Sequence, residues 1–137
     1  MKHQGNVSDF KDDRDRDLHR SFMEVLRNSE GVALRDMFAI AALRPSRRFW
    51  VSEGRAAIVI GAMLSGKSLE RMIPERRDMF EEIHCRVVAK MKADPGLCLT
   101  HAVNETVYEP APRFFLTPES ARSIIYRYRR RRKEGRP

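Results

Sequence analysis

From Leu18 onward, apolar side chains recur at intervals of three and four residues, the spacing that gathers them on one side of an α-helix. Turn-forming and helix-capping residues separate the successive stretches of this pattern. The apolar stripes cover residues 18–26, 34–42, 56–64, 80–91, 99–107 and 121–128. The pattern therefore predicts an all-α protein of six helices, without a strand.

Capping residues mark several of the expected helix ends. Ser52 is placed as the N-cap of the third helix, and Gly66 is placed to end it in the left-handed conformation. Pro74 suits the first turn of the fourth helix. Thr117 and Pro118 form a cap and a first helical residue for the sixth helix, which we expect to extend to residue 133.

The sequence also matches itself when it is shifted by 65 residues, without a gap over positions 18–62. The clearest match is between PSRRFWVS at 45–52 and PAPRFFLT at 110–117. Eight of the 45 compared pairs are identical: His19/His84, Gly31/Gly96, Leu34/Leu99, Pro45/Pro110, Arg48/Arg113, Phe49/Phe114, Ala56/Ala121 and Ile60/Ile125. We interpret this as a duplication, which predicts two tandem three-helix units related by a pseudo-twofold axis.

The duplication leads to a predicted domain organisation. Residues 47–51 and 112–116 alternate like extended segments, so a minimal two-stranded ribbon between them is an option. In chain order we expect a flexible arm at 1–17, a first three-helix unit at 18–66, a second at 67–128 and a basic tail at 129–137. We expect residues 18–128 to form one compact domain.

Residues 61–68, GAMLSGKS, fit the phosphate-loop pattern G-x-x-x-x-G-K-[ST]. A working phosphate loop follows a strand and opens a helix at its Lys-Ser pair. Here the preceding residues show helical spacing after a cap at Ser52, and Pro74 limits any helix that begins at Lys67. We interpret the match as accidental and expect neither nucleotide binding nor a cofactor.

Charge is distributed unevenly along the chain. The formal net charge is +8, and residues 122–137 contain eight Arg or Lys against one acid, a net of +7. The remaining residues hold 19 basic and 18 acidic side chains, a net of +1. A polyanionic partner is therefore expected at the C-terminal segment.

Other functional classes receive little support from the composition. No apolar run reaches the roughly 18 residues of a membrane helix, and residues 1–17 lack the apolar region of a signal peptide. Two cysteines suit a reducing cytoplasm. The spacing of Cys98 and His101 allows zinc ligation, but the neighbouring His84 and Cys85 diverge on a helix, so we expect no metal site. No nucleophile–base pair is evident, and we expect no enzymatic activity.

Two helices, a turn and a capped third helix give a general resemblance to helix-turn-helix proteins, which place their last helix in the DNA major groove. The second unit suits this role because its last helix carries outward-facing arginines, which bind phosphates and guanine edges. The expected nucleic-acid-binding residues are Arg113, Arg122, Ser123, Arg127, Arg129, Arg130, Arg131, Arg132 and Lys133.

The expected function is accordingly non-enzymatic DNA binding in transcription regulation or DNA architecture, with RNA as another possible ligand. The alternative is an adaptor or assembly protein whose duplicated fold binds a protein partner or a second copy of itself. Arg48 and Arg113, which match in the repeat, have two interpretations. They could hold phosphates, or they could have a structural role, in which they hydrogen-bond the last carbonyls of the preceding helix or pair with an acid; the sequence favours the structural interpretation.

Overall fold

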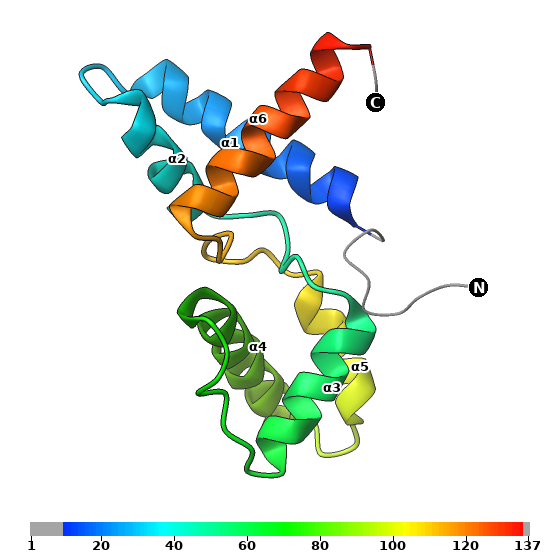
Figure 1. Ribbon diagram of the computed structural model, residues 1–137. Helices are drawn as coiled ribbons and strands as arrows, with labels where there is room; N and C mark the ends of the chain where they lie inside the picture. Colours follow the sequence, from blue (N-terminus) through cyan, green and yellow to red (C-terminus); the bar gives the residue numbers. More distant parts are fainter. Residues whose placement is uncertain (1–9, 136–137) are drawn as a thin grey trace. The chain divides into compact units, whose positions relative to one another are not determined.

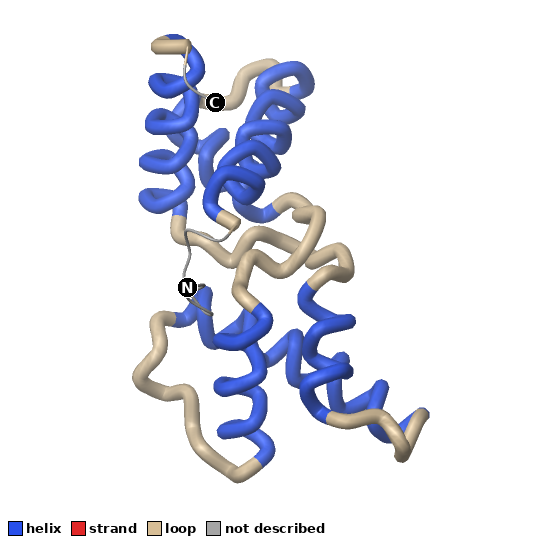
Figure 2. The backbone as a smooth tube through the Cα atoms, turned by 90° about the vertical axis from the view of Figure 1, so that its right-hand side faces the viewer, coloured by secondary structure: helices blue, strands red, loops and turns tan. Residues whose placement is uncertain are grey.

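The computed structural model describes residues 10–135, and within that range it contains helices, turns and loops but no strand (Figure 2). The helices are α1 (Lys11–Asn28), α2 (Leu34–Leu43), α3 (Glu53–Leu64), α4 (Pro74–Ala93), α5 (Leu99–Val107) and α6 (Pro118–Lys133). The prediction of an all-α protein with six helices is confirmed.

The expected helix ends are present. The Ser52 hydroxyl accepts a hydrogen bond from the backbone N–H of Arg55, and the Thr117 hydroxyl accepts one from Ser120. Gly66 has a φ of +90°, the left-handed conformation that glycine adopts without strain. Residues 61–64 belong to α3, so the phosphate-loop pattern follows helix rather than strand.

The expected flexible arm at 1–17 is wrong for residues 11–17, which form the first turns of α1; residues 1–9 lie outside the described part. The side chains of Asp15 and Asp17 are buried within these turns. Arg14 donates to Asp15, and Arg20 donates to Asp17 at 2.6 Å. These ion pairs explain the error, because they stabilise a buried helical segment that lacks an apolar stripe.

The helices belong to two compact units (Figure 1). The α3–α4–α5 unit comprises Phe10 and residues 47–110, and the α1–α2–α6 unit comprises residues 11–46 and 111–135. This differs from the prediction of one compact domain with contiguous units at 18–66 and 67–128. Each unit instead takes its third helix from the other half of the sequence.

Residues 65 apart make similar backbone hydrogen bonds in the two units. In the α3–α4–α5 unit the Phe49 N–H donates to the carbonyl of Val107, at 3.0 Å. In the α1–α2–α6 unit the Phe114 N–H donates to the carbonyl of Ala42, at 2.9 Å. The first bond joins the segment that precedes α3 to the end of α5, and the second joins the segment that precedes α6 to the end of α2. In each case the two partners come from different halves of the sequence. The duplication and the pseudo-twofold axis remain predictions.

The ribbon expected between residues 47–51 and 112–116 is absent from the described structure. An isolated antiparallel bridge joins Ser46 and Ala111, whose N–H and carbonyl groups exchange two hydrogen bonds of 3.0 Å. Within the two segments, the N–H groups of Phe49 and Phe114 donate instead to carbonyls at helix ends.

Both units have apolar cores with charged groups at their edges. In the α3–α4–α5 unit, the Arg86 guanidinium lies 4.9 Å from the Phe49 ring and donates to the Pro110 carbonyl. The Arg48 guanidinium donates to the carbonyls of Phe49 and Val51, which follow it in its own connector, whereas the structural interpretation named the last carbonyls of the preceding helix. The core of the α1–α2–α6 unit consists of Leu18, Phe22, Val25, Met37, Phe38, Ala41, Ala42, Phe114, Phe115, Ala121, Ile124 and Ile125.

Candidate nucleic-acid interface

Helix α6 carries most of the expected binding residues, and its position follows from its apolar stripe. Ala121, Ile124 and Ile125 are buried against α1 and α2. Pro118 begins the helix, where its missing N–H removes no helical hydrogen bond. In Figure 1, α6 crosses α1, and its outward side is left open to solvent along the helix.

The exposed side of α6 is strongly basic. Ser123, Arg127 and Arg130 follow one another at intervals of four and three, which places them on one side of the helix. The expected residues that are exposed on α6 are Arg122, Ser123, Arg127, Arg129, Arg130, Arg132 and Lys133. The helix extends to Lys133, as expected, so the part of the basic tail at 129–133 belongs to α6 and holds its charges at helical spacing.

Arg131 occupies a different position from these residues. Its guanidinium donates to the fully buried carboxylate of Asp15 at 3.0 Å, and its own side chain is only 19% exposed. The Arg131 Nε is buried and lacks a hydrogen-bond partner. This arginine joins α6 to α1, so we assign it a structural role within the unit.

Arg113 precedes α6 and is half-buried. Its guanidinium lies 4.7 Å from the centre of the Phe115 ring, and its carbonyl accepts a hydrogen bond from the Ser46 hydroxyl. Phe115 has a φ of +57°, a left-handed conformation that is unfavourable for a residue with a side chain. The structure therefore places Arg113 in a constrained connector and not among the exposed α6 cations.

A polar hollow of about 360 Å³ lies beside the first half of α6. Arg127 and the hydroxyl-bearing Ser120 and Ser123 line it from α6, and Arg14 lines it from α1. Leu116, Glu119 and Ile124 complete the lining. Guanidinium and hydroxyl groups together are suitable donors for phosphate oxygens. Two of the residues expected from the sequence, Ser123 and Arg127, are thus brought together.

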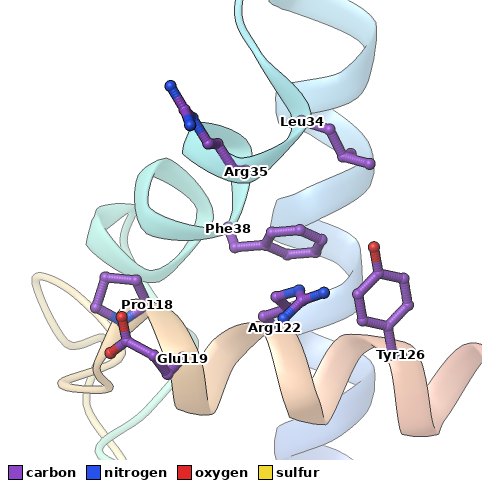
Figure 3. Close-up of a pocket in the computed structure, with 7 residues that line it drawn as sticks. All are labelled: Leu34, Arg35, Phe38, Pro118, Glu119, Arg122 and Tyr126. Carbon is purple, nitrogen blue, oxygen red and sulfur yellow. The ribbon is translucent and has the colours of Figure 1, made fainter.

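A second hollow, of about 340 Å³, lies between α2 and α6 and is more aromatic (Figure 3). The ring centres of Phe38 and Tyr126 are 5.4 Å apart, and the Arg122 guanidinium lies 5.3 Å from the Tyr126 ring. Phe38 is 2% exposed and forms the floor, whereas Tyr126 is 41% exposed. Leu34, Arg35, Pro118 and Glu119 complete the lining.

Sequence reasoning missed four of the residues in these hollows: Arg14, Arg35, Phe38 and Tyr126. Phe38 was expected only as a core residue. Tyr126 follows Arg122 by one helical turn on the outward side of α6, so its helical position could have identified it. Arg14 and Arg35 give no sequence signal, because only the packing of α1 and α2 against α6 brings them to this surface.

His19 lies beneath the basic end of α6, with its ring centre 4.9 Å from that of Tyr128. Burial lowers the pKa of His19 below its usual 6.5, and the positive charges of Arg129 and Arg132 lower it further. The His19 Nε2 is buried without a hydrogen-bond partner. These surroundings favour the neutral imidazole, so His19 adds no charge to the interface at neutral pH.

The chain matches no family model, curated protein or solved structure. No helix within residues 10–135 has the length and apolar character needed to cross a membrane. Within the same residues, no three or more His, Cys, Asp or Glu side chains gather as metal ligands. The geometry and charge of the α6 surface are therefore the features that bear on function.

Proposed function

We propose that the protein binds nucleic acid, DNA or RNA, through the exposed side of α6, in a regulatory or architectural role without catalysis. One observation carries the proposal: α6 holds exposed basic side chains along successive turns and has a hollow beside them lined by hydroxyl and guanidinium groups. A folded helix fixes the distances between these charges, which favours a regular array of phosphates over diffuse attraction. We propose a cytoplasmic location together with this function.

The proposal differs from a helix-turn-helix in how α6 is supported. In that motif the recognition helix packs on the helices that directly precede it. Here α6 belongs to a unit with α1 and α2, which are far from it in the sequence. We therefore assign the binding role to the surface formed by α6 and the neighbouring parts of α1 and α2, without assuming insertion into a major groove.

Charge removal on α6, compared with equal charge removal elsewhere, tests the proposal. The site variant replaces Arg127, Arg130 and Lys133 with Ala. The control variant replaces three basic residues of the α3–α4–α5 unit, which are also exposed: Lys67, Arg71 and Lys92. Both variants lose three positive charges, so a difference between them reports position and not net charge.

Fluorescence anisotropy with labelled oligonucleotides, over about 50 to 200 mM salt, measures the effect. We expect the site variant to bind more weakly at every salt concentration. Its slope of log affinity against log salt should be less steep by about 2 to 3, since each phosphate contact contributes roughly 0.9 for duplex DNA and 0.7 for a single strand. The control should retain most of the affinity. Equal losses in the two variants, or salt-independent binding, would refute the proposal.

The alternative is protein association through the α3–α4–α5 unit, where large apolar side chains are exposed. Ile58 on α3 is 67% exposed, and Leu64 and Ile73 are about half exposed. Exposed apolar groups of this size favour association with another protein surface. Sedimentation of the intact protein with and without an Ile58→Glu substitution tests this alternative: a concentration-dependent assembly that the substitution abolishes would support it.

A further inference from the structure

The aromatic hollow beside α6 contains an unusual exposed ring. Tyr126 extends from the same helix that carries the basic side chains, and its neighbours Phe38 and Arg122 stand beside it in Figure 3. Tyr126 is 41% exposed even though its ring lies against Phe38 of α2. An exposed aromatic ring within a basic surface is a characteristic feature of proteins that bind unpaired nucleotides.

The hollow has a suitable size and chemistry for one nucleobase. Its volume of about 340 Å³ exceeds that of a purine ring system, and the exposed Tyr126 and Leu34 supply apolar surface beside the buried Phe38. The Arg122 guanidinium, 5.3 Å from the Tyr126 ring, is a second planar group on which a base can stack. Any base can stack on the exposed surface of either group, because every base has a π face.

The charged groups around the hollow indicate how a nucleotide would enter. Glu119 stands near Pro118 at one edge, and its carboxylate repels a phosphate there but accepts hydrogen bonds from base amino groups. Arg122 provides a cation beside the aromatic rings. A base edge therefore suits the Glu119 side, and the sugar–phosphate backbone suits the basic side chains.

Glu119 also lines the polar hollow, so the two hollows lie on either side of the first turns of α6. A strand that crosses these turns can place a phosphate near Ser123 and Arg127 and a base against Tyr126. In a duplex the bases are paired and stacked inside the helix, and removing one requires a few kcal/mol. A base already unpaired does not require that energy.

We propose that the hollow between α2 and α6 receives one unpaired nucleobase stacked on Tyr126, which gives the protein a preference for single-stranded nucleic acid over duplex. This inference rests on the proposed function, since the basic face of α6 would hold the backbone of the same strand. It names single-stranded nucleic acid as the preferred ligand, a preference that the charge of α6 alone does not define.

The test compares Tyr126→Leu, which removes the aromatic face but keeps an apolar side chain, with Tyr126→Phe, which keeps the ring. Each variant and the intact wild-type chain are titrated by anisotropy against a single strand of about 15 nucleotides and against its duplex. The single strand is tested as DNA and as RNA. Urea denaturation of each variant confirms that it remains folded.

We expect wild type to bind at least one of the single strands about tenfold or more tightly than the corresponding duplex. Tyr126→Leu should weaken single-strand binding about tenfold, the effect of losing a base–aromatic stack. It should leave duplex binding and the salt slope unchanged. Tyr126→Phe should retain the wild-type preference. A 2-aminopurine base in the strand should be quenched by wild type and less so by Tyr126→Leu.

Two results would overturn the inference while leaving the proposed function intact. One is duplex binding as tight as single-strand binding for both DNA and RNA. The other is an equal effect of Tyr126→Leu on strand and duplex. A failure of the proposed function is distinguishable from these, because wild type would then bind neither form in a salt-dependent manner.

Discussion

Asp15 connects the first turns of α1 to the last turns of α6. Its carboxylate is fully buried and accepts hydrogen bonds of 3.0 Å from Arg14 and from Arg131. This ion pair adds to the apolar packing that holds α6 against α1. Because Arg131 is mostly buried as well, loss of the Asp15 carboxylate would leave its charge with a weaker partner, the exposed carboxylate of Asp12 at 3.9 Å.

Replacement of Asp15 by Ala is therefore expected to be strongly destabilising. We expect the free energy of unfolding to fall by about 3 kcal/mol, typical for removing one partner of a buried ion pair. Urea denaturation monitored by circular dichroism measures it. Asp13→Ala is the matched control, because Asp13 is 69% exposed and its pair with Arg16 is 3.6 Å long; we expect a change within about 0.5 kcal/mol. Equal effects of the two substitutions would contradict the assigned role of Asp15.

The surroundings of His19 lead to a second prediction at the scale of a single residue, which concerns the pH dependence of stability. Burial and the charges of Arg129 and Arg132 lower its pKa in the folded state relative to about 6.5 in the unfolded chain. On acidification the unfolded chain therefore binds a proton first, and stability falls between pH 6.5 and the lower folded pKa. Above pH 6.5 both states are neutral at this residue, so its contribution vanishes.

The variant His19→Phe tests this, since it keeps a ring against Tyr128 but cannot titrate. We expect wild type to lose more unfolding free energy than the variant when the pH is lowered from about 7.5 to 5.5. His101→Gln, at a histidine that is 67% exposed, is the control for the loss of one imidazole. A His19→Phe variant that loses as much stability as wild type over this range would exclude the effect.

At the scale of the element, α6 depends on its N-terminal cap. The Thr117 hydroxyl accepts the N–H of Ser120, one of the groups that an α-helix leaves unpaired in its first turn. We expect Thr117→Ala to lower the free energy of unfolding by about 1 kcal/mol, and Thr117→Ser to have little effect. Thermal and urea denaturation measure both. A Ser variant as unstable as the Ala variant would show that the hydroxyl is not the stabilising group.

The elements also show which structural features the sequence could predict. Helices α2 to α6 were predicted because their stripes and caps are local features, with Ser52 and Thr117 as examples. The start of α1 was missed because Asp15 and Asp17 are buried through ion pairs, and partners such as Arg131 are remote in the sequence. The helix was expected to begin where apolar spacing begins.

In the candidate site too, local features were predictable from the sequence and features that depend on remote contacts were not. Composition and helical spacing were enough to select the basic residues of α6, including Arg122 and Arg127. The hollows were not predicted, because Phe38 approaches Tyr126 only when α2 and α6 pack together. The ion pair of Arg131 was not predicted for a similar reason: in the sequence it is one of a run of arginines, and only the fold places Asp15 beside it.

At the scale of the whole molecule, the chain connects its units in an exchanged order. Helices α1 and α2 share a unit with α6, and α3 shares one with α4 and α5. A helical repeat predicts where helices begin but not which copies pack together, because both arrangements bury the same apolar stripes. The connector bond from Phe114 to Ala42 is an example of a contact between the two halves of the sequence.

This exchanged order predicts that the two halves of the sequence are not independent folding units. A protease site inserted after Ser68, in the exposed loop between α3 and α4, would divide the chain into a fragment with α1 to α3 and a fragment with α4 to α6. The first fragment would expose the buried side chains of Val59 and Ile60, and the second would expose those of Ile124 and Ile125. Isolated helices of this length are marginally stable in water without such packing.

We therefore expect the cleaved chain to remain folded as a complex of the two fragments, since each unit still contains all its helices. The fragments separated in urea and refolded alone should each show low helix content by circular dichroism, and an equimolar mixture should recover the helix signal of the uncut chain. If each unit were contiguous in the sequence, each fragment would fold by itself, and mixing the fragments would not increase the helix signal. Strong helicity and cooperative unfolding of either isolated fragment would therefore exclude the exchanged order, because that fragment would have to bury its apolar stripes without the helices that cover them in the intact chain.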